Sequence, residues 1–115
     1  MDIKLLVLRS NDIKKLCDFY TLLGIAFEYH KHDNSPYHYS AIIGKMVLEI
    51  YPLSKSQYEA DKNLRLGFDL ELFDEAVEKL VANNIQFSMQ PVQSDYGFMA
   101  VVLDPDGRKV ELYKK

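Results

Sequence analysis

The feature that most constrains the fold of this sequence is that its second half repeats its first half. A shift of about 60 positions places Ile13 on Phe73 and Phe27 on Phe87. The segments VLEIY and KVELY, which lie near the ends of the two halves, also match after a further slip of two positions. We therefore predict that the chain contains two copies of one structural unit.

Each half is predicted to have the element order βαβββ, because runs of apolar and β-branched residues surround one stripe with helical spacing. Strands are expected over residues 3–9, 25–30, 37–43 and 46–51 in the first half, and over 64–70, 85–89, 96–103 and 108–113 in the second. The predicted helical stripes are Ile13, Leu16, Cys17 and Tyr20 in the first half, and Phe73, Ala76, Val77, Leu80 and Val81 in the second.

These elements predict an α+β fold in which two βαβββ modules form a cupped mixed sheet. Residues 1–115 are interpreted as a single domain, with module one at about 1–52 and module two at about 64–115. The polar segment 53–63 lacks any hydrophobic period and is interpreted as a linker.

Composition excludes several classes of partner. The formal charge of −3 argues against nucleic acid, whose binding proteins usually present a basic surface. No apolar run is long enough for a membrane span, and the N-terminus lacks the pattern of a signal peptide, so we expect a cytoplasmic protein. The single cysteine, Cys17, cannot form an internal disulfide and is expected to be a core residue.

The alternation of side chains along a strand predicts which residues face away from the helices. In residues 46–51 the apolar set should cover the helix, which turns Glu49 and Tyr51 outward. The same reasoning turns Glu111 and Tyr113 outward near the C-terminus. The full predicted outward set is Leu5, Val7, Arg9, Glu49, Tyr51, Arg65, Gly67, Asp69, Glu111 and Tyr113. Such a surface is either a ligand pocket or a solvated sheet face whose charges pair with one another.

The paired modules resemble the glyoxalase, bleomycin-resistance and extradiol-dioxygenase superfamily, also called vicinal oxygen chelate proteins. The resemblance covers the whole chain and is carried by RSNDIKKLCDFYTLLG in the first half and LDPDGRKVEL near the end. It implies a glyoxalase/bleomycin-resistance fold. It does not fix the function, because one fold can carry many activities.

The resemblance also implies where relatives hold a metal ion. The four corresponding positions are Leu5, Glu49, Arg65 and Glu111. In the glyoxalase I pattern the first and third of these are histidines. Leucine has no ligand atom, and a guanidinium offers only hydrogen-bond donors and a positive charge that would repel a cation. We therefore expect no metal at these positions and no cofactor, and we expect Arg65 to pair with a glutamate.

Three histidines, His30, His32 and His38, lie close together in HKHDNSPYH. We interpret them as part of a solvated loop. A surface zinc site is a less favoured alternative, since the motif lacks cysteines and a second ligand pair. A histidine of this loop could also act as a general base if the loop covered the outward face.

The function favoured by these observations is non-covalent binding of a small molecule, as in a protein of the antibiotic-resistance type. Tyr51 and Tyr113 would stack on the ligand, and Arg65, Glu49 and Glu111 would recognise its polar groups. One alternative is a divergent lyase, isomerase or dioxygenase-related enzyme with Glu111 or Glu49 as catalytic residue. Another alternative is an accessory domain whose sheet binds a protein. The resemblance further implies a homodimer.

Overall fold

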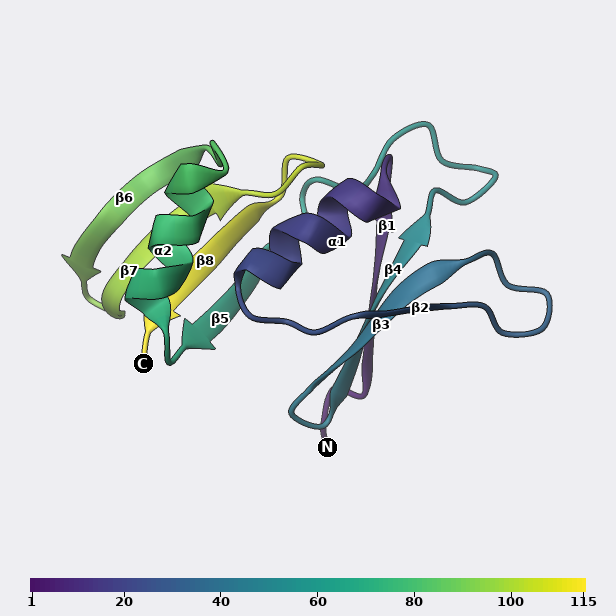
Figure 1. Cartoon of the computed structure of the whole chain (residues 1–115), viewed down its shortest axis with the longest axis horizontal. Coiled ribbons are helices and arrows are strands. Elements are labelled where there is room, and N and C mark those ends of the chain that lie inside the picture. Colours follow the sequence, from purple (N-terminus) through teal and green to yellow (C-terminus); the bar gives the residue numbers. More distant parts are fainter. The chain divides into compact units, whose positions relative to one another are not determined.

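The computed structural model describes all 115 residues of the chain. The chain divides into two compact units, Met1–Ala60 and Asp61–Lys115, which we call module one and module two and describe separately. Module one contains β1 (Leu5–Ser10), α1 (Ile13–Leu22), β2 (Glu28–His30), β3 (His38–Ile43) and β4 (Met46–Pro52). Module two contains β5 (Leu66–Leu70), α2 (Phe73–Ala82), β6 (Phe87–Ser94), β7 (Gly97–Leu103) and β8 (Lys109–Lys114) (Figure 1).

The two modules have the same sheet topology. The strand order is β1-β4-β3-β2 in module one and β5-β8-β7-β6 in module two. In each sheet the first strand pairs in parallel with the last, and the remaining pairs are antiparallel. This confirms the predicted α+β fold with two βαβββ modules, with the strands forming two four-stranded mixed sheets.

Helix α1 begins and ends where the local sequence predicts. The Asp12 carboxylate accepts a hydrogen bond from the Lys15 backbone N–H at 3.1 Å and so caps the first turn. Gly24, with φ at 101°, follows the last turn in a conformation that glycine adopts readily. Asn84 takes the same place after α2 with φ at 58°. Neither helix is long and apolar enough to cross a membrane.

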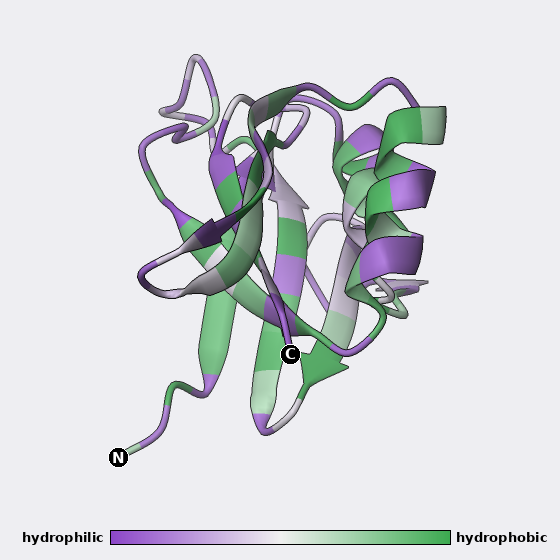
Figure 2. Ribbon diagram, turned by 90° about the vertical axis from the view of Figure 1, so that its left-hand side faces the viewer, coloured by the Kyte–Doolittle hydropathy of each residue, from purple (hydrophilic) through white to green (hydrophobic).

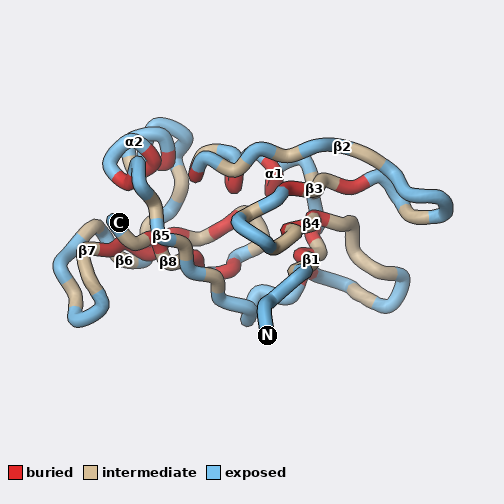
Figure 3. The backbone as a smooth tube through the Cα atoms, turned by 90° about the horizontal axis from the view of Figure 1, so that it is seen from below, coloured by how far each residue is buried: buried red, intermediate tan, exposed pale blue.

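The hydrophobic core of each module lies between its helix and its sheet. Hydrophobic and hydrophilic residues alternate along the strands (Figure 2), and the buried residues concentrate on the helices and the inner strands (Figure 3). Leu48, Ile50, Val110 and Leu112 are fully buried. Cys17 is also buried, as predicted, and burial raises the pKa of its thiol, which is expected to make it unreactive.

Some predicted boundaries are wrong. Strand β2 is shorter than the predicted 25–30. The predicted helical stripe is also too long, because Val81 lies in α2 but is exposed. Strand β6 continues through Pro91 to Ser94, although the pattern predicts an end at residue 89. Pairing with β7 shifts register between Phe87 and Met89 and again between Met89 and Val92. These irregularities accommodate Pro91, which cannot donate to a regular ladder.

The turn between β7 and β8 is held by a buried ion pair. Asp104 accepts hydrogen bonds from the backbone N–H groups of Asp106 at 2.8 Å and Arg108 at 3.0 Å. Its second carboxylate oxygen lies 3.2 Å from the Arg108 guanidinium. Both side chains are almost completely buried, so an arginine that the sequence alone would place at the surface belongs to the interior.

Candidate functional site

Strands β5 and β8 place the predicted outward residues of module two side by side. Gly67 pairs with Glu111 and Asp69 pairs with Tyr113 in the parallel ladder. Leu112, which lies between Glu111 and Tyr113, is fully buried under α2. Glu111 and Tyr113 keep partial exposure, and the module therefore has an inner apolar face and an outer polar one.

Glu111 is the centre of a small hydrogen-bonded group on this outer face. Arg65 Nε donates to its Oε2 at 2.5 Å, and the Tyr113 hydroxyl donates to its Oε1. The Tyr113 hydrogen bond, followed by the Arg65 contact, lowers the pKa of the Glu111 carboxyl group from its ordinary value. The same hydrogen bond raises the pKa of the Tyr113 phenol. A carboxylate held in its ionised form is a weak proton acceptor, which disfavours Glu111 as a general base.

A hollow of about 560 Å³ opens next to this group. Its residues come from the position just before β5, from β6, β7 and β8, and from the turn between β6 and β7, and they combine apolar and polar side chains. They are Arg65, Met89, Ser94, Tyr96, Met99, Val101, Glu111 and Tyr113. The sequence singled out Arg65, Glu111 and Tyr113. It missed Ser94, the last residue of β6, and Tyr96, in the turn between β6 and β7, since the position of both depends on the irregular path of β6.

Gly67 lies beside the same group without blocking it. A Cβ atom at this position would be 3.7 Å from Glu111 Cβ and 3.7 Å from the Tyr113 ring. An alanine would therefore fit in ordinary van der Waals contact. A longer side chain would extend towards Tyr113, and the glycine keeps this part of the outer face open.

The pH dependence of the Glu111 group gives a direct test. We expect Tyr113→Phe to raise the pKa of the Glu111 carboxyl group, because it removes the largest cause of its lowering. The group's contribution to folding stability should be present above the carboxyl pKa of the unfolded chain and should be lost as the pH falls through the lower folded value. Titration of the side-chain carboxyl ¹³C signal by NMR measures both effects. An unchanged Glu111 titration in Tyr113→Phe would contradict the contact.

Module one presents a different chemistry at the matching positions. Val7 pairs with Glu49 and Arg9 with Tyr51 in the parallel ladder between β1 and β4. The Arg9 guanidinium carbon lies 5.0 Å from the centre of the Tyr51 ring. Leu5, at the start of β1, is exposed. Glu49 does not pair with an arginine as Glu111 does. Its Oε2 lies 3.4 Å from His38 Nε2.

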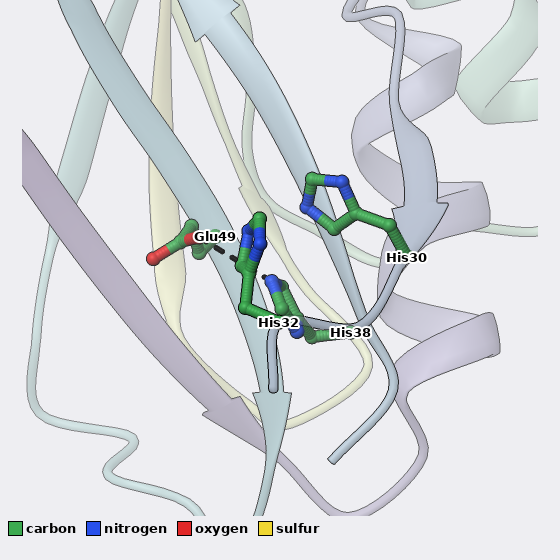
Figure 4. A group of neighbouring side chains, drawn as sticks. All are labelled: His30, His32, His38 and Glu49. Carbon is green, nitrogen blue, oxygen red and sulfur yellow. Dashed lines mark ion pairs between the residues drawn. The ribbon is translucent and has the colours of Figure 1, made fainter. Parts of the chain in front are cut away.

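The interpretation of the histidines as a solvated loop is wrong for two of the three. His38 belongs to β3 and is completely buried, and His30 belongs to β2 and is half-buried. Only His32, in the connection between these strands, is exposed. Side-chain atoms of the three histidines and Glu49 lie within 4.8 Å of one another (Figure 4). The turn at Gly44 is the sequence feature that points to this cluster. It sets Ser40 opposite Glu49, and His38, two positions before Ser40, therefore lies on the same face of the sheet as Glu49.

The duplicated modules, each with a helix on one face of a mixed sheet and polar residues on the other, define the glyoxalase-like class of folds. The profile described as "Glyoxalase/Bleomycin resistance protein/Dioxygenase superfamily" matches residues 2–112. The chain belongs to this superfamily. A search of curated proteins gives no significant match.

Several solved structures share the fold over nearly the whole chain. SMU.1112c is 26% identical, with a TM-score of 0.71 and coverage of 99% of this chain and 98% of the other. TnmS3, an antibiotic binding protein from Streptomyces sp. CB03234, is 18% identical, with a TM-score of 0.78 and coverage of 99% and 95%. The trypanothione-dependent glyoxalase I of Leishmania major is 22% identical, with a TM-score of 0.73 and coverage of 99% and 86%. At these identities the last two show the fold alone.

Proposed function

We propose that this protein binds a small molecule non-covalently on its outer sheet faces. The similar structure TnmS3 is an antibiotic binding protein, which supports this proposal. The observation that carries the proposal is the hollow of module two, whose wall combines Met89, Met99 and Val101 with Arg65 and Tyr113. Ligand sites usually combine a mostly apolar lining with a few oriented polar groups. A planar aromatic ligand with polar substituents suits this lining, since Tyr113 offers a ring face and Arg65 offers donors.

The state of Glu111 supports binding over catalysis. Both oxygens of its carboxylate already accept hydrogen bonds, one from Arg65 and one from Tyr113. A base catalyst needs a carboxylate that can take a proton near the working pH, and these contacts act in the opposite direction. Gly67 and Asp69 extend the proposed binding residues of module two, and Leu5, Val7 and Tyr51 are the corresponding proposed binding residues on the outer face of module one. The second candidate remains a divergent enzyme that uses Glu49 or Glu111.

We also propose that the four superfamily metal positions do not together hold a shared metal ion in this protein. Leu5 cannot ligate, and Arg65 places a cation at the third position, where its guanidinium bonds Glu111. This pairing removes one carboxylate from the ligand set. The proposal concerns these four positions only.

A thermal-shift screen tests the binding proposal. The probes are bleomycin, as a cationic peptide antibiotic, and a panel of planar aromatic metabolites. A ligand at 100 times its Kd should add about 2.7 kcal/mol to the free energy of unfolding and raise Tm by several degrees. We expect Arg65→Ala to weaken the binding of any such ligand ~10-fold, because a hydrogen bond from a charged donor is lost.

The control for this screen is Lys14→Ala, which removes an exposed cation of α1 and should leave the affinity unchanged. The alternative enzyme function is tested by assaying the protein with the hemithioacetal of glutathione and methylglyoxal in the presence of added divalent metals. Turnover of this substrate, together with no thermal shift from any probe, would reject the binding proposal in favour of the enzyme.

Following the resemblance, we propose that the protein acts in the cytoplasm as a homodimer, with neither nucleic acid nor membrane as partner. Light scattering on the untagged protein should give a molecular mass of twice the 13.4 kDa of one chain. A mass of a single chain would reject the dimer and leave the binding proposal as it stands.

A further inference from the structure

We propose that His30, His32, His38 and Glu49 form a binding site for a divalent transition-metal ion, with Zn²⁺ as the probe of choice. The site lies within module one and uses only one of the four positions at which relatives hold metal. It therefore does not depend on the ligand site proposed for module two.

Strand pairing brings the four side chains to one face of the sheet. His30 and His38 are direct partners in the antiparallel ladder of β2 and β3, so both project to the same side. Glu49 on β4 is paired with Ser40, one step along the same face from His38. The four side chains converge on a common point from β2, β3, β4 and the connection between β2 and β3 (Figure 4).

A tight turn returns His32 to this point. The Ser35 backbone N–H donates to the His32 carbonyl at 2.7 Å, and the His32 N–H donates to the Ser35 hydroxyl at 2.9 Å. Asp33 adopts a positive φ of 42° within this turn. The ring centres of the three histidines are 4.5 to 5.3 Å apart as a result.

The hydrogen bonds of His38 direct a lone pair into the cluster. Its Nδ1 lies 3.0 Å from the Pro36 carbonyl oxygen, which can only accept, so Nδ1 carries the hydrogen. In a neutral ring Nε2 then has a lone pair, and it faces the Glu49 carboxylate at 3.4 Å. Fixing one ring nitrogen by a backbone carbonyl while the other meets the metal is the usual arrangement of a metal-bound histidine.

Two buried nitrogen atoms of the cluster have no hydrogen-bond partner. They are His30 Nε2 and His38 Nε2. A buried polar atom without a partner is costly, and two such atoms lie here beside a carboxylate oxygen. A cation at the centre would satisfy all of them together. The two unpartnered nitrogen atoms therefore support a cation site independently of the clustering of the four side chains.

The donor set selects the kind of metal. Three imidazole nitrogens and one carboxylate oxygen suit Zn²⁺ and neighbouring transition metals, whereas Mg²⁺ and Ca²⁺ prefer oxygen ligands throughout. Tetrahedral Zn²⁺ with bonds of about 2.0–2.1 Å requires ligand atoms ~3.3 Å apart. The pair from His38 and Glu49 is already at 3.4 Å, and the largest separation in the cluster, within 4.8 Å, needs only small side-chain rotations.

Four protein ligands complete a tetrahedral shell, so the bound ion would be structural. His32 is the exposed member and lies outside the strands, so the ion would fasten the connection between β2 and β3 to the sheet. We therefore expect metal binding to slow amide hydrogen exchange in residues 31–37.

The test uses the untagged full chain after removal of metal with a chelator. We expect Co²⁺ to bind with one-to-one stoichiometry and the visible absorption of a tetrahedral complex, and Zn²⁺ to displace it. His32→Gln and Glu49→Gln should each lower Zn²⁺ affinity more than ~10-fold, since even changes outside the ligand shell cost that much. Competition with a chromophoric chelator measures the affinity, and circular dichroism confirms that each variant is folded.

The matched control is Glu28→Gln, which changes an exposed carboxylate on the same sheet face outside the cluster. It should bind Zn²⁺ as the unaltered chain does. His38 is buried, so its replacement would also disturb the packing of the module, and the exposed His32 therefore provides the decisive variant. Absence of the Co²⁺ spectrum, or equal Zn²⁺ affinity in His32→Gln, Glu49→Gln and Glu28→Gln, would overturn the proposal and leave a simple contact between His38 and Glu49.

Discussion

Replacement of Asp104 by alanine should lower the free energy of unfolding by about 3–5 kcal/mol, the cost of breaking a buried ion pair from one side. The change leaves the buried Arg108 guanidinium without its contact at 3.2 Å. It also removes the acceptor for the backbone N–H groups of Asp106 and Arg108. Asp106 Oδ2, at 3.5 Å from Arg108, keeps a longer contact that reduces the loss.

Urea unfolding monitored by circular dichroism measures this effect. Asp18→Ala is the matched control, because its pair with Lys14 is exposed on α1 and should contribute about 0–1 kcal/mol. Asp104→Asn retains an oxygen acceptor and loses the charge, so it should fall between the two. If Asp104→Ala were as stable as Asp18→Ala, the buried pair would have no role in holding the turn.

The second large effect is expected for Leu112→Ala, at about 2–5 kcal/mol. Leu112 is fully buried and lies opposite Phe68 and Ala100 in the two ladders that flank β8. Truncation would open a cavity between α2 and the sheet. The adjacent Glu111→Ala should cost only about 0–1 kcal/mol, because the Glu111 pair with Arg65 is partly exposed.

These neighbouring variants separate the two faces of one strand. Leu112→Ala should lower the urea midpoint strongly and leave the affinity for a bound probe unchanged under conditions where the protein is folded. Glu111→Ala should leave the urea midpoint nearly unchanged and should lower the affinity for the bound probe. Equal destabilisation by the two variants would mean that the outer face supports the fold as much as the inner one does.

The sequence predicts the fold well because the duplication is strong and local patterns agree with it. The two helices begin after residue 12 and at residue 73, and the outward direction of Glu49 and Glu111 follows from alternation alone. Both conclusions depend on spacing within a strand or a helix, where neighbouring residues determine the geometry.

Other features depend on pairing between distant segments and were not predicted. The burial of His38 requires the register of β3 against β4 and the return of the turn at Asp33, and neither follows from residue types near His38. The burial of Arg108 depends on a carboxylate four positions earlier that a turn sequence would normally expose. The course of β6 past Pro91 depends on its irregular pairing with β7.

The irregular path of β6 has a consequence for how the protein behaves at high concentration. Strand β6 is the outermost strand of its sheet, and a long, straight outermost strand is a template on which further copies of a chain can stack into fibrils. Two register shifts bend this strand, and Pro91 removes one backbone donor from it. The irregular strand that supplies Met89 and Ser94 to the hollow of module two should therefore also protect the protein from aggregation along this edge.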